Sequence, residues 1–334
     1  MSSAPGNGTT AAVHGVDLVC PACRGWRDDA WHQSALSDRS DELVCRSCDA
    51  SFASVTVGNH RIATFHTEIS ESAFDESIAS FEAATWASNH WGMFTQPPLV
   101  EPQLAWLADL LAGLDDLPDG PILVLGSATC GVLPALPRDR DVVCMDAHPG
   151  HLAMAAELAN GRAMLPYAKA PEVIAQRPVA LPDDAQTRLQ KAVMICGDAL
   201  NPPFGPDEFA LIVCLNLLDS IARPTLLMSQ CEALVKPTGA VVFASPYNWA
   251  EHITAHDERL DTILAKRDDF ELAVESLATG AIDPGFMAQM RLQWCDRKVQ
   301  WTLRAHDRMK VCFAQHAFLL RRLAAPPNRA VTGD

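Results

Sequence analysis

The sequence lacks any long uninterrupted hydrophobic run, and none approaches the roughly 18 apolar residues that a membrane-spanning helix needs. The amino-terminal segment MSSAPGNGTTAAVHG has neither a basic start nor an apolar stretch, so it does not have the pattern of a signal peptide. We interpret residues 1–16 as a short disordered tail and expect a cytoplasmic protein.

Basic side chains are also scarce. The 334 residues include 26 Lys and Arg against 41 Asp and Glu, which gives a formal net charge of −15. This balance disfavours broad binding to nucleic-acid phosphates, which requires clustered cations. Apolar residues make up 49 % and charged residues 20 %, so a large core is possible and general disorder is excluded. The length allows about two domains.

Eleven cysteines in a chain without an export signal do not indicate a disulfide framework. Four of them form two CxxC pairs, Cys20–Cys23 and Cys45–Cys48, with 21 residues between the pairs. Two such pairs can supply four thiolates to one tetrahedral Zn²⁺, and a site closed by four sulfurs is structural. We therefore predict a zinc ribbon over residues 17–66.

A strand alternation on either side of Gly58 predicts a hairpin that completes this ribbon. The module has little core of its own, so we expect the metal to hold it together. Acidic and basic side chains are mixed within it, which favours a scaffold or protein contact over nucleic-acid binding.

Helical and strand patterns alternate from about residue 99. We expect helices at 104–114, 151–158 and 226–235, and strands at 121–126, 141–146, 192–196, 209–215 and 239–245. Two further strands, 299–305 and 310–320, are separated by a short turn. The pattern predicts an α/β fold, a Rossmann-like mixed sheet with a terminal antiparallel hairpin, preceded by the small zinc ribbon.

The predicted domain organisation follows from these patterns. Residues 67–115 form a helical lid or linker, and 116–325 the main domain. Residues 160–190 and 252–297 are interpreted as insertions, the second of them helical.

In open α/β sheets a ligand binds beyond the carboxyl ends of the strands. The small residues of Gly126–Gly131 follow the first strand and allow backbone N–H groups to approach a ligand. Asp146 ends the second strand and can accept hydrogen bonds from ribose hydroxyls. Asp198 follows the third strand and can accept from an adenine amino group. The three loops in this order predict an adenosine-containing ligand.

This constellation resembles the class I S-adenosylmethionine-dependent methyltransferases over about residues 85–325. The resemblance implies that S-adenosylmethionine is the cofactor. The residues that it implies for cofactor binding are Gly126, Ser127, Ala128, Asp146, Ala147, Asp198, Ala199 and Asn216. Two departures stand out: Val124 occupies the position of the family's usual acidic residue, and Ala128 and Cys130 replace later glycines.

Two segments are more specific. Residues 214–224, CLNLLDSIARP, and 244–249, ASPYNW, resemble the corresponding parts of imidazole N-methyltransferases of the protein-histidine, carnosine and ovothiol-pathway types. Residues 300–308 resemble the last of these. The resemblance implies methyl transfer to an imidazole ring of a small histidine-derived molecule, such as a 5-thiohistidine, or of a peptide.

Imidazole chemistry gives three residues possible roles. A neutral imidazole has one free lone pair at pH 7, and a carboxylate that accepts the ring N–H selects which nitrogen carries it. Asp219 is the candidate for that role, with Asn216 orienting the ring or the cofactor. The Tyr247 hydroxyl is a further catalytic candidate. Trp249, His90 and Trp91 are candidates for acceptor binding.

Several alternatives stay open. Asp219 can simply cap the following helix, and the tryptophans can belong to the core. An RNA methyltransferase guided by its zinc ribbon is a second functional class, and a non-catalytic module that uses the fold to bind a partner is a third. A dinucleotide dehydrogenase fits poorly, because a full G-x-G-x-x-G motif is absent. We expect a small-molecule or peptide acceptor and no membrane contact. A homodimer or a protein contact through the ribbon remains possible.

Overall fold

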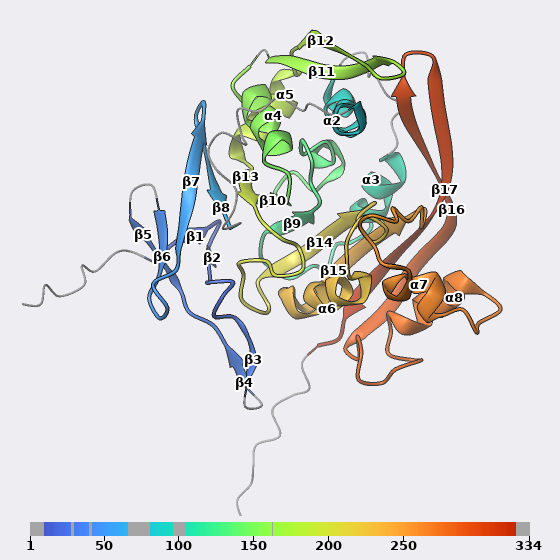
Figure 1. Ribbon diagram of the computed structural model, residues 1–334. Coiled ribbons are helices and arrows are strands. Elements are labelled where there is room, and N and C mark those ends of the chain that lie inside the picture. Colours follow the sequence, from blue (N-terminus) through green and yellow to red (C-terminus); the bar gives the residue numbers. More distant parts are fainter. Residues whose placement is uncertain are drawn as a thin grey trace, which may run out of the picture.

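The computed structural model describes residues 10–27, 30–39, 42–65, 81–95, 104–161 and 163–324. One mixed sheet dominates it (Figure 1). Its strands are β5 (Leu36–Arg39), β6 (Glu42–Cys45), β7 (Ser51–Val57), β8 (His60–Thr64), β9 (Ile122–Leu125), β10 (Val142–Asp146), β13 (Val193–Cys196), β14 (Phe209–Leu215), β15 (Val235–Ser245), β16 (Met290–His306) and β17 (Met309–Arg322). Their spatial order in this 11-stranded sheet is β16-β17-β15-β14-β9-β10-β13-β8-β7-β6-β5.

The centre of the sheet is parallel, and both edges are antiparallel. Each pair of adjacent strands from β8 through β13, β10, β9 and β14 to β15 is parallel. At one edge β17 pairs antiparallel with β15 and with β16, and at the other β5, β6, β7 and β8 pair antiparallel in turn. This arrangement confirms the predicted Rossmann-like mixed sheet and its closing hairpin. The central strands are short apolar runs because both of their faces are covered.

Helices cover the two faces (Figure 1). On one face lie α2 (Phe81–Trp91), α3 (Ala105–Ala112), α4 (Pro149–Ala159) and α5 (Asp183–Lys191); on the other lie α6 (Pro224–Leu234), α7 (Leu260–Ile263) and α8 (Phe270–Leu277). Strand β9 shows the division, because Ile122 and Val124 pack into one hydrophobic core and Leu123 and Leu125 into the other. No helix among the described residues is both long and apolar enough to cross a membrane.

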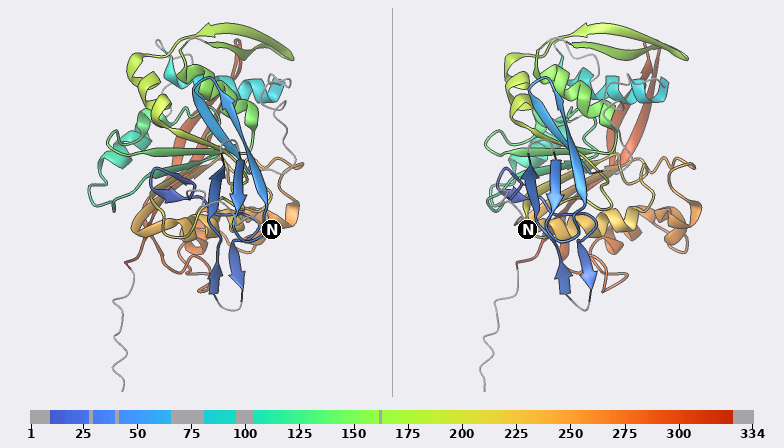
Figure 2. Two further views of the ribbon diagram at one scale, coloured as in Figure 1. Left: turned by 90° about the vertical axis from the view of Figure 1, so that its left-hand side faces the viewer. Right: turned by 60° about the vertical axis from the view of Figure 1, so that its left-hand side comes forward.

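The amino-terminal module continues this sheet instead of forming a separate unit (Figures 1 and 2). The hairpin expected around Gly58 is β7–β8, and β8 pairs in parallel with β13 through Ala63 and Ile195. Leu36 and Phe52 belong to the same hydrophobic cluster as the main-domain core. The apolar side chains of the module are therefore buried against the larger domain, which adds a support that the sequence analysis did not anticipate beside the expected metal.

The predicted tail over residues 1–16 has defined structure in its second half, at residues 10–16. Residues 1–9 lie outside the described part of the chain, but β1 (Ala12–Val13) and β2 (Val16–Asp17) form a short antiparallel pair. Ala11 and Val16 are buried in the core, which holds this segment in place. A second small pair is β3 (Gly25–Arg27) with β4 (Ala30–His32). The predicted boundary at residue 66, and parts of the predicted 67–115 linker, lie outside the described residues.

The two predicted insertions have defined structure. Residues 160–190 contain the antiparallel pair β11 (Ala163–Ala170) and β12 (Val173–Val179) and then α5. Met164 and Val173 are apolar but exposed, so these strands lack the regular alternation of buried apolar and exposed polar residues by which a strand is recognised in a sequence. Residues 252–297 hold η3 (His256–Glu258), α7 and α8, but the strand β16 already begins at Met290. The helical prediction for 290–297 is therefore wrong.

The loop after β9 has the backbone shape of a glycine-rich turn with few glycines. Ala128 and Cys130 adopt φ values of 45° and 61°, in the left-handed region that favours glycine. Only a 3₁₀ turn, η2 (Leu133–Ala135), lies between β9 and β10, so no long helix begins behind this loop. The loop after β9 therefore keeps a strained conformation that surrounding contacts must hold.

Another 3₁₀ turn, η1 (Gly92–Phe94), follows α2, and its Phe94 packs into the hydrophobic core on the α2–α5 face of the sheet.

This strain predicts how glycine substitutions behave. In Ala128→Gly, relief of a left-handed alanine, worth about 1–2 kcal/mol, offsets the lost methyl group and the added chain entropy. Ala156→Gly is the matched control, since Ala156 is equally buried but helical in α4. We expect the control to lower the free energy of unfolding by at least about 1 kcal/mol more than Ala128→Gly in chemical denaturation. Equal losses would show that Ala128 is not strained.

Candidate functional site

The three loops predicted to bind a ligand meet at one edge of the sheet. The Ser127 N–H donates to the carbonyl of Met145, at 3.1 Å, which joins the loop after β9 to the end of β10. The Gly197 N–H donates to the carbonyl of Asp146, at 2.9 Å, which joins the loop after β13 to the same strand end. The edge is therefore one continuous surface built from strand ends that are adjacent in the sheet.

Asp146 is the central charge of this edge. One carboxylate oxygen accepts the Ala128 N–H at 2.7 Å, and the other accepts the His148 N–H at 2.8 Å. Burial opposes ionisation, but the neighbouring His151 and these two backbone donors lower the pKa of Asp146 below its usual value. Asp146 is thus a carboxylate at neutral pH, and it holds the loop that precedes it.

Three histidines surround Asp146, and sequence reasoning assigned a role to only one of them. His151 Nδ1 lies 3.7 Å from an Asp146 oxygen, and its ring stacks on that of His148 with centroids 4.4 Å apart. Burial, and then the neighbouring His151, lowers the pKa of His90 to about 4 and also lowers that of His148. Both rings are therefore neutral at pH 7. The sequence signal that could have identified them is a pair of histidines, His148 and His151, placed directly after strand β10.

The other predicted cofactor residues lie on the same edge. Asp198 is exposed, and its carboxylate caps its own loop by accepting the Leu200 N–H at 2.8 Å. Ala147 is exposed beside Asp146, whereas Ala199 is buried. The side-chain hydroxyl oxygens of Ser127 and Thr129 are buried without a hydrogen-bond partner among the described residues. Such orphaned groups beside a strained loop are what a polar ligand would satisfy.

A cleft opens beside this edge, at the ends of β9 and β14. Its lining consists of Trp86, Asn89, His90, Met93, Leu104, Trp106, Val124, Leu125, Gly126, Ser127, Val132, Leu215, Asn216, Trp301 and Gln315. Among these described residues there is no Asp, Glu, Lys or Arg, so the cleft is aromatic, apolar and uncharged.

The lining of the cleft combines tryptophan rings with the side-chain carboxamides of Asn216 and Gln315. Trp86 of α2 stacks on Trp301 of β16 with ring centroids 5.7 Å apart. Gln315 of β17 donates a hydrogen bond from its amide to the side-chain oxygen of Asn216, which follows β14 with a positive φ of 55°. Sequence reasoning identified Asn216 but missed Gln315, because nothing local marks it.

Helix α2 is fastened over the cleft. The Asn89 side chain accepts the Arg304 N–H at 2.9 Å and donates to the Arg304 carbonyl at 2.9 Å, so one amide pairs with the backbone of β16 in both directions. At the other end, a Cβ on Gly131 would lie 2.4 Å from the His90 carbonyl oxygen. Only glycine permits this contact between the helix end and the loop after β9.

Asp219 does not line the cleft. Its side chain is 3 % exposed, and one oxygen accepts the Asn248 N–H at 2.7 Å. Burial raises the pKa of Asp219 above its usual value. The structure therefore gives Asp219 a contact that shapes the turn after β15, and the predicted contact with an acceptor ring remains untested.

Tyr247 and Trp249 lie on the opposite face of the sheet from the cleft, against the core formed with α6 and α8. The Tyr247 hydroxyl forms a 2.9 Å hydrogen bond with His316 Nδ1, and His316 Nε2 lies 3.2 Å from Glu275. Burial raises the pKa of Tyr247 well above its usual value. The predicted grouping of Tyr247 with Asn216 is therefore not seen.

The three predicted acceptor-binding residues are dispersed. His90 lines the cleft, but its neighbour Trp91 is fully buried, and the Trp91 indole donates to the Pro166 carbonyl at 3.3 Å. Successive helical residues point to different faces, so His90 and Trp91 cannot both face one cleft. Trp91 belongs to the core, which corrects the prediction.

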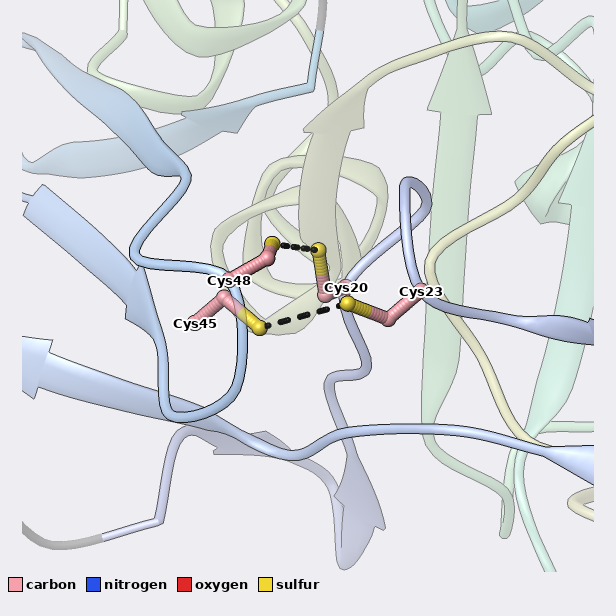
Figure 3. A group of neighbouring side chains, drawn as sticks. All are labelled: Cys20, Cys23, Cys45 and Cys48. Atoms are coloured by element: carbon pink, nitrogen blue, oxygen red, sulfur yellow. Dashed lines mark hydrogen bonds between the residues drawn. The ribbon is translucent and has the colours of Figure 1, made fainter.

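The four predicted metal ligands converge (Figure 3). Cys20 and Cys23 lie in the turn before β3, Cys45 ends β6, and Cys48 lies in the turn that follows. Their sulfurs all lie within 4.8 Å of one another, with Cys20–Cys48 at 3.8 Å and Cys23–Cys45 at 3.7 Å. The Ser47 N–H donates to Cys45 Sγ at 3.3 Å. This arrangement suits a four-sulfur metal site.

Comparison with known proteins addresses the central domain. Residues 123–243 match a family described as a methyltransferase domain. No curated protein matches the chain significantly. Solved structures that resemble it include a candidate sarcosine dimethylglycine methyltransferase from Galdieria sulphuraria (13 % identity, 71 % of this chain and 93 % of that chain, TM-score 0.41) and a SAM-dependent methyltransferase from Aquifex aeolicus (12 %, 67 % and 94 %, 0.38). A Haemonchus contortus phosphoethanolamine N-methyltransferase 2 in complex with S-adenosyl-L-methionine is a third (16 %, 54 % and 36 %, 0.34).

The structural likenesses are weak, and the identification rests on the family match and on the site. The matched residues run from β9 to β15 and include the loop after β9, Asp146, Asp198 and Asn216. The chain therefore contains an S-adenosylmethionine-dependent methyltransferase domain.

Proposed function

We propose that the protein transfers a methyl group from S-adenosylmethionine to a ring nitrogen of a neutral imidazole, in a small histidine-derived molecule or a peptide. The observation that carries the proposal is the cleft, which is walled by tryptophans and contains the Asn216–Gln315 carboxamide pair; among the residues that the structure describes, no charged side chain lines it. A flat, uncharged heterocycle with one N–H group and one lone pair complements these features. The resemblance of residues 214–224 and 244–249 to imidazole methyltransferases supports the same class.

Residues of the sheet edge would hold the cofactor. Asp146, an ionised carboxylate with lone pairs beyond those used by Ala128 and His148, is suited to the ribose hydroxyls. Asp198 is suited to the adenine amino group. Val124 offers no acceptor for the cofactor's ammonium group, whereas His90 is neutral at pH 7 and can accept a hydrogen bond. We assign His90 to that contact.

The chemistry requires orientation rather than acid–base activation. When bound, S-adenosylmethionine would supply its methyl group to the nitrogen lone pair, with its sulfur keeping the bonding electron pair as the thioether. The Asn216–Gln315 pair presents a carboxamide oxygen, which can accept the ring N–H and leave the other nitrogen free to attack. The ring becomes cationic as the bond forms, and the faces of Trp86 and Trp301 stabilise a cation beside them. The ring N–H proton then passes to solvent.

The cysteine cluster supports a structural zinc ion. A tetrahedral site with Zn–S bonds of about 2.3 Å has S–S edges of about 3.8 Å. The Cys20–Cys48 and Cys23–Cys45 separations, 3.8 and 3.7 Å, agree with that geometry. All four positions would be filled by protein sulfurs, so such an ion would have no catalytic role.

Acceptor class is tested by incubating the purified protein with methyl-labelled cofactor and, separately, imidazole thiols and histidine dipeptides, total RNA, or cell protein. We expect label in the small imidazoles or in peptide histidine. Label in RNA alone would contradict the imidazole proposal and favour an RNA methyltransferase. A protein that binds cofactor and labels none of these would also contradict it.

The carboxamide pair predicts the effect of Gln315→Ala. Loss of a hydrogen bond that orients the acceptor should lower kcat/KM for the imidazole by about 10- to 100-fold and leave the Kd for S-adenosylhomocysteine nearly unchanged. Gln300→Ala, an exposed glutamine on neighbouring β16, is the control and should behave like the wild type. Equal activity in the two variants would remove Gln315 from the site.

Metal content tests the cysteine cluster. Elemental analysis should find one zinc per chain in the wild type and little in Cys48→Ser, with a lower melting temperature in the variant because a structural ligand is lost. Cys312→Ser is the control, since Cys312 is also exposed but lies on β17, away from the cluster. Stoichiometric zinc in Cys48→Ser, or none in the wild type, would contradict the assignment.

A further inference from the structure

The loop after β13, residues 197–204, is held between two segments of the amino-terminal module. At its start, the Phe65 N–H donates to the Cys196 carbonyl at 2.8 Å, and a Cβ on Gly197 would lie 3.5 Å from Phe65 Cβ. This loop carries Asp198 and so forms one side of the cofactor edge. Phe65 follows β8, and β8 pairs with β13.

The end of the loop is bound by the strand that leads into the first CxxC pair. The Val19 N–H donates to the Pro203 carbonyl at 3.0 Å, and Leu18 forms an antiparallel bridge with Phe204. Leu18 and Phe204 are both buried in the common core. The contact is therefore a packed interface between the module and the loop.

The turn between the metal ligands reaches the middle of the loop. The Asn201 amide donates to the Pro21 carbonyl at 3.1 Å. Pro21 lies between Cys20 and Cys23, and the Cys23 N–H closes that turn by donating to the Cys20 carbonyl at 3.1 Å. The position of the Pro21 carbonyl therefore depends on the geometry of the two cysteines that flank it.

The same turn is fixed to the body of the domain. Arg24 is buried, and its guanidinium donates to the Gln230 side chain of α6 at 3.0 Å. Figure 2 shows the module lying along the sheet edge. A turn tied to both α6 and the loop can act as a rigid support.

We propose that the metal-bound cysteine cluster positions the cofactor loop, with Asn201 as the positioning residue that links the Cys20–Cys23 turn to Asp198. This inference rests on the proposed cofactor and zinc sites. With the cluster intact, the loop is ordered before the cofactor binds. Without it, the cofactor must order the loop, and that cost appears as weaker binding.

The test measures the Kd for S-adenosylhomocysteine by calorimetry on zinc-loaded protein. Asn201→Ala should weaken binding about fivefold, the effect of one lost hydrogen bond, with zinc content and melting temperature unchanged. Asn59→Ala is the matched control, because Asn59 is also exposed but lies in the β7–β8 turn of the amino-terminal module and not in the cofactor loop. It should bind like the wild type. Equal Kd values for the two variants would overturn the inference.

Chelation provides a second arm. Removing the metal should weaken binding about tenfold in the wild type, and by a smaller factor in Asn201→Ala if that contact carries the coupling. Linkage also requires S-adenosylhomocysteine to raise the zinc affinity by the same factor, which competition with a chromogenic chelator measures. A zinc affinity that does not change with saturating ligand would overturn the coupling.

These outcomes separate the two proposals. Zinc-loaded wild type that does not bind S-adenosylhomocysteine would remove the cofactor site, and the coupling with it. Tight binding that is indifferent to both chelation and Asn201→Ala would remove the coupling alone. If chelation unfolds the protein, the zinc-loaded Asn201→Ala comparison decides.

Discussion

The carboxylate of Asp146 connects the parts of the proposed site. It accepts a backbone N–H from the loop after β9 and another from the segment that begins α4, while the backbone carbonyl of the same residue accepts the N–H of Gly197. Three loops are thereby fixed relative to one another at the ends of three strands. The Ala128 N–H that this carboxylate accepts lies in the strained part of the first loop, where Ala128 and Cys130 have positive φ values. The carboxylate that would bind the ribose thus also holds the neighbouring loops in position through its hydrogen bonds.

The site has two unlike halves. The edge around Asp146 and Asp198 is polar and carries negative charge, which suits a nucleoside with many hydroxyl and amino groups. The neighbouring cleft is aromatic and, over its described lining, uncharged, which suits a flat neutral ring and the positive charge that would pass from sulfur to nitrogen in the proposed transfer. The boundary lies at Gly126 and Ser127, where a sulfonium that bridges the two halves would sit. The amino-terminal module adds support from outside, because it extends the sheet and holds the loop after β13.

Most of the central sheet, and most of the polar residues at its edge, could be predicted from the sequence because the pattern that marks them is local. Buried parallel strands are continuous apolar runs, so β9, β10, β13 and β14 were identified to within about one residue, and the residues that end them followed. The four cysteines were equally visible, because their spacing is local. In contrast, Gln315 meets Asn216 only through the register of β17 on β15, which pairs Ala317 with Ala244, and no local pattern encodes that register. The roles predicted for Asp219, Tyr247 and Trp91 rested on motif residues near them in sequence. The orientation of Asp219 and Tyr247 depends on how the turn after β15 packs on one face of the sheet, and that of Trp91 depends on how helix α2 packs on the other.

The central claim is that Asp146 and the cleft at Asn216 bind the two ends of one cofactor. A crystal structure with S-adenosylhomocysteine tests it most directly. The account predicts both ribose hydroxyls on the Asp146 carboxylate and the cofactor sulfur at the mouth of the cleft beside Gly126 and Asn216. A ligand bound elsewhere, or one whose ribose makes no contact with Asp146, would contradict it.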